Sequence, residues 1–330
     1  MKELSLTDKL LFFFNSIVAF LLLASYVIPF IPPKLTTTVS LLSLGMPILI
    51  VLNTIFFIYW LVKLKKQFFL SFLILTIGYQ HINAFIQFGE QHIAENTIKI
   101  MSYNVRLFNI YKWSKKNDLD KNIYEFIHIK NPDIISFQEY ILQKNNSLQY
   151  KYTYTVGRSS IYSKYKIIDK GSLDFSKGGN NAIYVDIKIN KDTVRVYNLH
   201  LESFRIDKNK EHFGQQDSEK LLNRFKRTFR KQEEQVDKLI RHASKSPYRT
   251  IFMGDFNNTA FSWVYRKLIH HKKDAFITAG NGFGKTFSYV FPMRIDFILT
   301  DSEIKVESFK TYSEEYSDHF PIMARIHIPK

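Results

Sequence analysis

Three apolar stretches near the start of the chain constrain its fold more than any other feature. They cover residues 10–31, 41–62 and 68–88, and none contains an acidic side chain, a lysine or an arginine. Each is about as long as the roughly 20-residue helix that crosses the hydrocarbon core of a bilayer. The alternative for each stretch is a buried core helix, but helices in soluble proteins rarely stay apolar on every face. We therefore predict three transmembrane helices.

The third stretch carries a weaker signal than the first two. It contains Gln80, His81 and Asn83, so a helix that lies in the membrane interface is an alternative to one that crosses. The first stretch ends in a proline-rich segment, residues 29–33, and lacks the small-residue cleavage pattern of a signal peptide. We therefore expect it to be retained.

Lysines in the short connecting segments predict the orientation. Lys2 and Lys9 precede the first stretch, three lysines lie between residues 63 and 66, and only Lys34 lies in the first link. The positive-inside rule then places the N-terminus and the second link in the cytoplasm. Three crossings would put everything after Phe88 in the periplasm or outside the cell, whereas two crossings would leave it in the cytoplasm.

The composition changes at about residue 93, which we predict as the boundary between a membrane anchor (1–92) and a catalytic domain (93–330). The net charge of the whole chain is +16, and the part after residue 92 has 40 Lys and Arg against 27 Asp and Glu. An excess of this sign favours an anionic partner: nucleic acid, lipid head groups or a phosphorylated small molecule. The chain has no cysteine, which excludes disulfides, thiolate catalysis and a Cys-ligated zinc site.

Alternating apolar runs predict many strands and two substantial helices in the second domain. We expect the helices at residues 119–129 and 218–242, and strands at residues 98–103, 133–137, 152–156, 160–162, 182–189, 193–199, 250–253, 295–300, 305–311 and 322–328. Many strands with few helices indicate an α+β domain in which helices and antiparallel sheets form separate layers.

Several of these strands end abruptly in polar residues that are suited to catalysis. Taken singly, each has an ordinary explanation: an amide in a turn, a loop carboxylate, a hydrogen-bonded core histidine or a helix cap. Taken together, carboxylates and amides suit Mg²⁺ or Mn²⁺, and histidines move protons or contact phosphate. The set is typical of metal-assisted attack of water on a phosphate ester. The sequence has no H-E-x-x-H, G-x-S-x-G or Walker A motif.

The strand-end motifs and their order resemble the endonuclease/exonuclease/phosphatase superfamily. The resemblance runs from about Thr97 to Ile328 and rests on "MSYNVR", "PDIISFQE", "YNLHLES", "GDFNNT", "RIDFIL" and "SDHFPI". It implies a four-layered α/β sandwich of two mostly antiparallel sheets, with the site at one mouth.

The resemblance also implies roles for individual residues. Asn104, Glu139 and Asp318 match metal-site positions for Mg²⁺, with Mn²⁺ as an alternative. His200 matches a histidine that contacts the phosphate. Asp255 matches the acid that activates water, and Asn257 matches its partner in the transition state. His319 matches a second phosphate-contacting histidine, and Asp296 matches the carboxylate that orients it. The resemblance leaves open which histidine is the general acid.

Three further residues are candidates for substrate contacts. Arg106 stands where some nucleases of the family have an acidic residue, and it can hold a phosphate or form a surface ion pair. Asn181 follows a glycine pair and can equally belong to a turn, and Arg205 begins a basic segment that continues to Lys231. That segment is either a solvated helix face or a collar for an anionic substrate or lipid head groups.

The resulting prediction is a membrane-anchored, Mg²⁺-dependent phosphoesterase, with a phosphodiesterase or nuclease as the leading interpretation. A phospholipid or sphingolipid phosphodiesterase and an inositol-type phosphatase are the first alternatives. A non-catalytic binding module on the same scaffold is the second. The expected partners are an anionic phosphoester substrate and the membrane.

Overall fold

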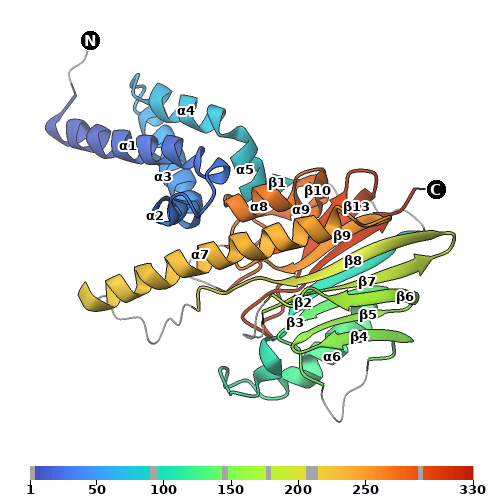
Figure 1. Cartoon of the computed structure of the whole chain (residues 1–330). Coiled ribbons are helices and arrows are strands. Elements are labelled where there is room, and N and C mark those ends of the chain that lie inside the picture. Colours follow the sequence, from blue (N-terminus) through green and yellow to red (C-terminus); the bar gives the residue numbers. More distant parts are fainter. Residues whose placement is uncertain are drawn as a thin grey trace.

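An N-terminal helical bundle and a body built on two β-sheets make up the chain (Figure 1). This computed structural model describes residues 4–89, 96–142, 148–175, 180–205, 215–288 and 293–329. Lys2, one of the lysines behind the predicted orientation, lies outside the described residues.

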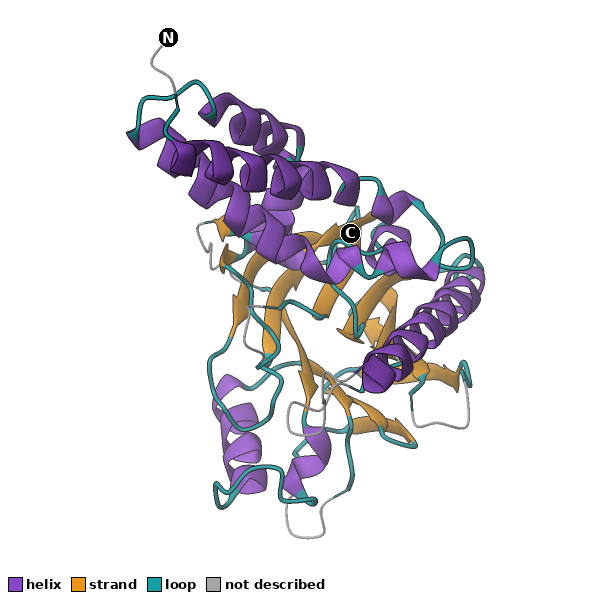
Figure 2. Cartoon of the chain, turned by 90° about the vertical axis from the view of Figure 1, so that its left-hand side faces the viewer, coloured by secondary structure: helices purple, strands orange, loops and turns teal. Residues whose placement is uncertain are grey.

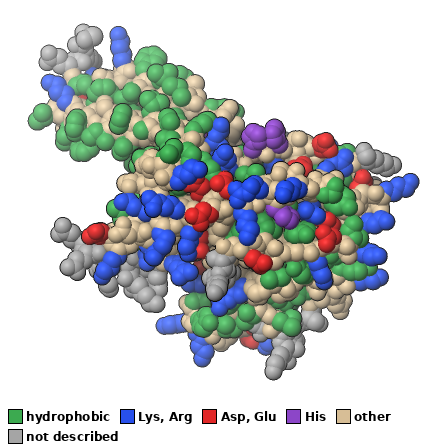
Figure 3. Space-filling model, in the orientation of Figure 1, with side chains coloured by type: hydrophobic (Ala, Val, Ile, Leu, Met, Phe, Trp, Pro, Cys, Tyr) green, Lys and Arg blue, Asp and Glu red, His purple; other side chains and the backbone are tan. Residues whose placement is uncertain are grey.

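The bundle contains two helices that are long and apolar enough to cross a membrane. The first runs over Leu6–Phe30 and combines α1 (Leu6–Ser25) with η1 (Ile28–Phe30), and the second is α3 (Leu42–Val62), preceded by the short α2 (Thr37–Ser40). Large side chains such as Phe13, Phe20 and Ile55 remain more than 50% exposed on the outer surface. Figure 3 shows this apolar surface projecting from the body. Such a large exposed apolar surface is typical of a membrane-facing region.

The third predicted span is not one straight helix. It consists of α4 (Phe68–Ile77) and α5 (Tyr79–Phe85), which are bent by 76° at the break between them. A Cβ on Gly78 would lie 1.9 Å from the Tyr26 hydroxyl, so only glycine fits at this bend. The bundle therefore has two candidate spans, or three if the bent pair counts as one.

Buried polar side chains pair the helices of the bundle. The Asn15 amide donates to Ser71 Oγ at 2.8 Å and accepts from Trp60 Nε1 at 2.9 Å. Because such groups have few partners in an apolar environment, they select one arrangement of neighbouring helices. At the end of the bundle far from the body, Asp8 forms an ion pair with Lys63 at 2.6 Å.

Two six-stranded sheets face each other in the body (Figures 1 and 2). The first has the order β13 (Lys305–Thr311), β14 (Ile322–His327), β2 (Ile98–Asn104), β3 (Ile134–Gln138), β5 (Ser159–Ser163), β4 (Tyr152–Val156). The second has the order β10 (Lys272–Asp274), β12 (Asp296–Asp301), β9 (Arg249–Asp255), β8 (Asp192–His200), β7 (Ala182–Ile189), β6 (Lys166–Ser172).

Each sheet contains one parallel pair and is otherwise antiparallel. The pairs are β2–β3, joined through η2 (Arg106–Asn109) and α6 (Leu119–Lys130), and β8–β9, joined through α7 (Gln215–Ala243). Helix α6 covers one face of the sandwich and α7 the other, beside α8 (Trp263–Leu268). The predicted α+β class and four-layered sandwich are confirmed.

Two small features complete the body. Helix α9 (Ala275–Ala279) packs against β12 and β13, and β1 (Gln87–Phe88) pairs with β11 (Asn281–Gly282). The core between the sheets is rich in β-branched residues such as Ile100, Val185 and Val196, all fully buried. Strand β6 was not predicted, because it lies at a sheet edge and most of its side chains are exposed or half-buried.

The bundle packs directly onto the body. One hydrophobic cluster contains Leu22, Met46 and Ala84 of the bundle together with Phe256 and Trp263 of the body. Backbone carbonyls of the bundle extend the contact: that of Ser43 accepts from Thr259 Oγ1 at 3.1 Å, and that of Ala84 accepts from the buried Arg294 at 3.1 Å. The N-terminal helices are therefore a packed part of the structure as well as a candidate membrane anchor.

Candidate active site

The topology gathers the strand-end motifs at one end of the sandwich. Asn104 and Glu139 lie at the carboxyl ends of the parallel pair β2–β3, and His200 and Asp255 lie at those of β8–β9. The antiparallel neighbours begin at the same end: Asp296 pairs with Asp255, and β14 starts just after the segment carrying Asp318 and His319. A cavity of roughly 430 Å³ opens there and is lined by Arg106, Glu139, His200, Asp255, Asn257, Asp318 and His319.

The backbone is unusual where the site residues leave their strands. Gly254 has a φ of +144°, and a Cβ there would lie 2.0 Å from the Leu199 carbonyl oxygen, so glycine is required before Asp255. Glu139 and Asn257 both have a φ of +48°. Non-glycine residues in this left-handed region are uncommon and gather at functional sites.

Asp255 lies at the centre of the site and is almost fully buried. Its carboxylate accepts hydrogen bonds from the Asn104 amide at 3.0 Å and from the backbone N–H of Asn257 at 2.8 Å. Burial and the nearby charge of Asp296 raise the pKa of Asp255 to about 7, although His319 acts in the opposite direction. A carboxyl group with this pKa can accept a proton near neutral pH.

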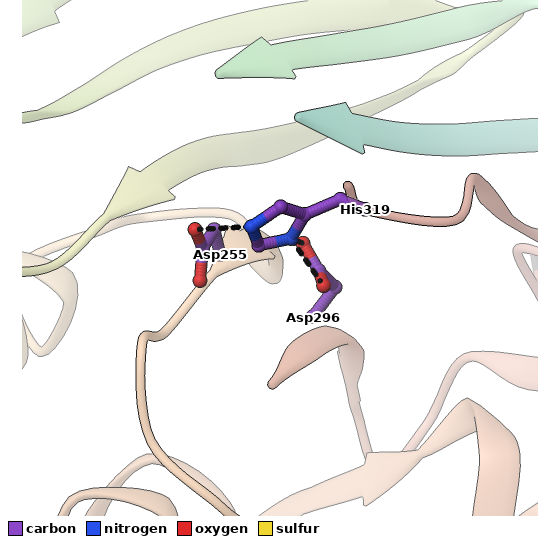
Figure 4. Close-up of side chains that lie close together, drawn as sticks. All are labelled: Asp255, Asp296 and His319. Carbon is purple, nitrogen blue, oxygen red and sulfur yellow. Dashed lines mark hydrogen bonds and ion pairs between the residues drawn. The ribbon is translucent and has the colours of Figure 1, made fainter. Parts of the chain in front are cut away.

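His319 lies between two carboxylates (Figure 4). Its Nδ1 is 2.9 Å from Asp296 Oδ2, and its Nε2 is 3.7 Å from Asp255 Oδ2. Burial disfavours the charged ring, but Asp296 and Asp255 outweigh burial and raise the pKa of His319 to about 10. His319 is therefore an imidazolium at neutral pH.

His200 has the opposite character. Burial, reinforced by the positive charges of His319 and Arg158, lowers the pKa of the His200 ring to about 3. Its Nε2 lies 3.8 Å from Asp255 Oδ2, and among the described residues its buried Nδ1 has no hydrogen-bond partner. The site thus combines one cationic and one neutral histidine around a single carboxylate.

The three candidate substrate residues are placed differently. Arg106 lines the cavity, pairs with Asp318 at 2.8 Å and stacks over the Trp113 ring. Arg205 also lines the cavity, with an exposed side chain.

Asn181 does not line the cavity. Its side chain donates to Ser172 Oγ at 2.7 Å and accepts from the backbone N–H of Phe175, so it stabilises a turn. Its neighbour Asn180 lines the cavity instead and donates to the Leu201 carbonyl at 2.8 Å.

Residues 101–319 match the endonuclease/exonuclease/phosphatase family, and residues 8–85 match a domain of unknown function, DUF8431. The chain belongs to the endonuclease/exonuclease/phosphatase family. Among curated proteins, none matches the sequence.

Several solved structures have the same fold as this chain. Humanized TDP2 from D. rerio is 17% identical with a TM-score of 0.53, and it covers 70% of this chain and 99% of its own. A family protein from Bacteroides vulgatus is 17% identical with a TM-score of 0.52, covering 71% and 100%. A mannosyl-6-phosphatase from Bacteroides thetaiotaomicron is 17% identical with a TM-score of 0.52, covering 70% and 100%. The family comprises phosphoester hydrolases, so the chain is a hydrolase of phosphate esters.

Enzymes of this family depend on a divalent cation, and the site offers two groups of possible ligands. Burial raises the pKa of Glu139, and the charges of His319 and Arg106 offset this only in part. A further cation beside Glu139 would therefore be stabilised, and Asn104 and Asp318 add the oxygen donors that Mg²⁺ prefers.

The second group is Asp255, Asp296 and His319, whose ligand atoms lie within 4.8 Å of one another. This group fits a metal less well, because a ligating imidazole must be neutral and the two carboxylates hold His319 protonated.

Several residues that line the cavity were given no role from the sequence. Arg158, in the turn between β4 and β5, lines the cavity, as do Leu44 of α3, Phe204 and Asn258. Asn258 belongs to a strand-end motif. The other three residues do not, so only the tertiary structure identifies them as part of the cavity wall.

Four aromatic residues precede "RIDFIL": Phe283, Phe287, Tyr289 and Phe291. The two that the structure describes have different surroundings. Phe287 lines the cavity beside His319, with ring centroids 4.9 Å apart, whereas Phe283 contacts Phe85 of α5. Tyr289 and Phe291 lie outside the described residues.

Proposed function

We propose that this protein is a membrane-anchored, divalent-metal-dependent phosphodiesterase that hydrolyses its substrate by direct attack of water on phosphorus. The observation that carries the proposal is the arrangement at Asp255: a carboxyl group with a pKa near neutrality lies between a neutral and a cationic histidine in one cavity. That combination supplies a general base and positive charge at the same point.

Each residue has a distinct part in the proposed reaction. Asp255 accepts a proton from the attacking water while the water oxygen bonds to phosphorus. His319 stabilises the negative charge that develops on the phosphoryl oxygens, and Asp296 orients the His319 ring. Asn257 and His200 contact the phosphoryl group, and the bond to the leaving oxygen breaks as that oxygen takes up a proton from solvent water, while Asp255 later returns its proton to solvent.

Glu139, Asn104 and Asp318 would hold Mg²⁺, with Mn²⁺ as an alternative. When bound, the cation would neutralise phosphoryl charge and polarise the phosphorus–oxygen bonds. Arg106 and Arg158 add positive charge at the cavity wall, where Arg106 can turn from Asp318 to a phosphate oxygen.

We further propose that residues 1–92 anchor the enzyme and that its catalytic domain, residues 93–330, faces the periplasm or exterior. The ion pair between Asp8 and Lys63 marks the end of the bundle away from the body. Helix α4 starts there beside Phe57, and after the 76° bend α5 continues to the body, where the Ala84 carbonyl accepts from Arg294 at 3.1 Å. This path supports a third passage of the chain across the bilayer.

Hydrolysis of bis(p-nitrophenyl) phosphate by the full-length protein in detergent tests the function. We expect turnover with Mg²⁺ that is lost on adding a chelator and restored by excess Mg²⁺. The variant His319→Ala should fold, as judged by circular dichroism, yet lose turnover. Full activity in the chelator or in the folded variant would refute the proposal.

A further inference from the structure

A membrane helix contributes to the wall of the catalytic cavity. Leu44, in the first turn of α3, lines the cavity that also contains Asp255 and His319. The adjacent residue reinforces this contact, because the Ser43 carbonyl accepts from Thr259 Oγ1 at 3.1 Å. Thr259 closely follows Asn257, so the anchor touches the same loop that carries the catalytic residues.

The cavity has an apolar part next to its phosphate-binding part. Leu44, Phe204, Phe287, Met293 and Ile295 line it together with the charged site residues. Nucleic-acid bases can stack on the two phenylalanines, but the aliphatic side chains of this wall offer no ring for stacking. A molecule that joins a phosphate ester to a hydrocarbon part matches both kinds of lining.

The position of Leu44 along α3 places the cavity near the membrane surface. Leu44 lies at the body end of a helix that continues through the bundle to Val62. If α3 spans the bilayer, its first turn lies at the level of the lipid head groups. The cavity beside Leu44 would then be within reach of a head group of the same bilayer.

The basic helix α7 lies on the same side. Its N-terminal half projects beyond the sheets toward the side of the bundle, and Lys and Arg side chains lie along it (Figures 1 and 3). Its C-terminal half contacts the link between the first two membrane helices, where the Lys34 backbone N–H donates to Glu233 at 2.7 Å. Exposed cations such as Arg227 and Arg230 would therefore face anionic head groups.

We infer that the substrate is the phosphate ester of a lipid in the bilayer that holds the anchor, with Leu44 contacting its apolar part. This inference rests on the proposed hydrolytic function. It selects the lipid alternative over the nuclease that the basic composition favoured, because the anchor itself completes the cavity.

The test uses the full-length protein reconstituted into vesicles of phosphatidylcholine, phosphatidylglycerol, sphingomyelin and phosphatidic acid. Lipid products are measured by mass spectrometry, both in these vesicles and in protein-free vesicles of the same composition that carry an isotope label. Bis(p-nitrophenyl) phosphate, plasmid DNA and RNA are assayed in parallel. We expect lipid turnover in the protein's own vesicles and little in the labelled ones.

The outcomes separate the two proposals. Turnover of the soluble diester or of nucleic acid without lipid turnover would overturn the lipid inference and leave the phosphodiesterase function intact. Equal turnover of both vesicle populations would also overturn it. No turnover of any substrate would refute the phosphodiesterase function itself.

Variants of Leu44 test the contribution of the anchor. Leu44→Asp should lower the ratio of kcat/KM for the lipid to kcat/KM for the soluble diester by about tenfold, because it removes an apolar contact from a substrate pocket. Leu44→Met should retain most of the ratio, since it conserves volume and polarity. Leu61→Ala, on the exposed surface of the same helix, is the matched control. An unchanged ratio in folded Leu44→Asp would contradict the inference.

Discussion

Two β–α–β units with the same topology deliver different chemistry to the site. In β2–α6–β3 the strands end in Asn104 and Glu139, whereas in β8–α7–β9 they end in His200 and Asp255. The first pair offers oxygen ligands and the second offers groups that exchange protons. We therefore propose that metal binding and proton transfer are divided between the two units.

The connecting helices differ as much as the strand ends do. Helix α6 has 12 residues and α7 has 29. Gln232 in the C-terminal half of α7 donates to the carbonyls of Glu202 and Asn257 and accepts from Asn258. The longer helix therefore supports the site loops through Gln232 and contacts the N-terminal bundle through Glu233, which accepts from the Lys34 backbone N–H.

Asp255→Asn should have the largest effect, because it removes the proposed general base from the second unit. We expect kcat at saturating Mg²⁺ to fall about 10²–10⁴-fold, with the apparent Mg²⁺ affinity little changed. Steady-state kinetics over a Mg²⁺ titration measure both quantities. A kcat within a few-fold of wild type would show that Asp255 is not the base.

Glu139→Gln should instead alter the metal requirement, because Glu139 belongs to the first unit. The Mg²⁺ concentration for half-maximal activity should rise about tenfold or more, and excess Mg²⁺ should restore part of the rate. If the variant lost kcat without any change in the Mg²⁺ requirement, the proposed division between the two units would be wrong.

The pH profile should report Asp255 of the second unit together with His319, which lies just before β14. Asp255 must be deprotonated to act as a base, so kcat/KM should rise as the pH rises through about 7. His319 must be protonated to stabilise charge, so kcat/KM should fall above about pH 10. Asp296→Asn removes a carboxylate that raises the pKa of His319, and the alkaline limb should therefore move to lower pH. An unchanged alkaline limb in this variant would show that His319 is not the group that titrates there.

Gln232→Ala should have the smallest effect on activity and a measurable effect on stability. It leaves the buried Asn258 amide and backbone carbonyls without a partner, at a cost of about 1–3 kcal/mol. Thermal unfolding in detergent should show a lower Tm. Lys121→Ala on α6, which removes only a surface ion pair with Asp118, should leave Tm nearly unchanged. Equal shifts in the two variants would contradict the supporting role of α7.

The strand ends that carry the candidate site residues could be located from the sequence because their motifs are local. Asp255, for example, follows an apolar strand and a required glycine, and both are visible in the sequence. Contacts between distant segments were not predictable in this way. Leu44 reaches the cavity from α3, a candidate membrane span, and Arg158 reaches it from a hairpin turn. The close approach of Gly78 to the Tyr26 ring likewise joins residues that lie far apart in the sequence.

Asn180 and Asn181 show that the sequence does not decide which of two adjacent side chains faces the cavity. Either side chain could face the cavity, and the choice depends on which one bonds to the Ser172 turn. Adjacent residues on an extended segment point in opposite directions, so a shift of one position changes the answer. Only the tertiary hydrogen bonds decide it.

The most direct test of the central claim is hydrolysis of the soluble diester by the full-length protein in ¹⁸O-labelled water. Direct attack of water on phosphorus predicts one ¹⁸O in the phosphate-bearing product of each turnover, with a rate of incorporation that depends strictly on Mg²⁺ and falls about 10²–10⁴-fold in Asp255→Asn. Label in the alcohol product would show cleavage of the carbon–oxygen bond instead. That result, or Mg²⁺-independent incorporation, would contradict the proposed mechanism.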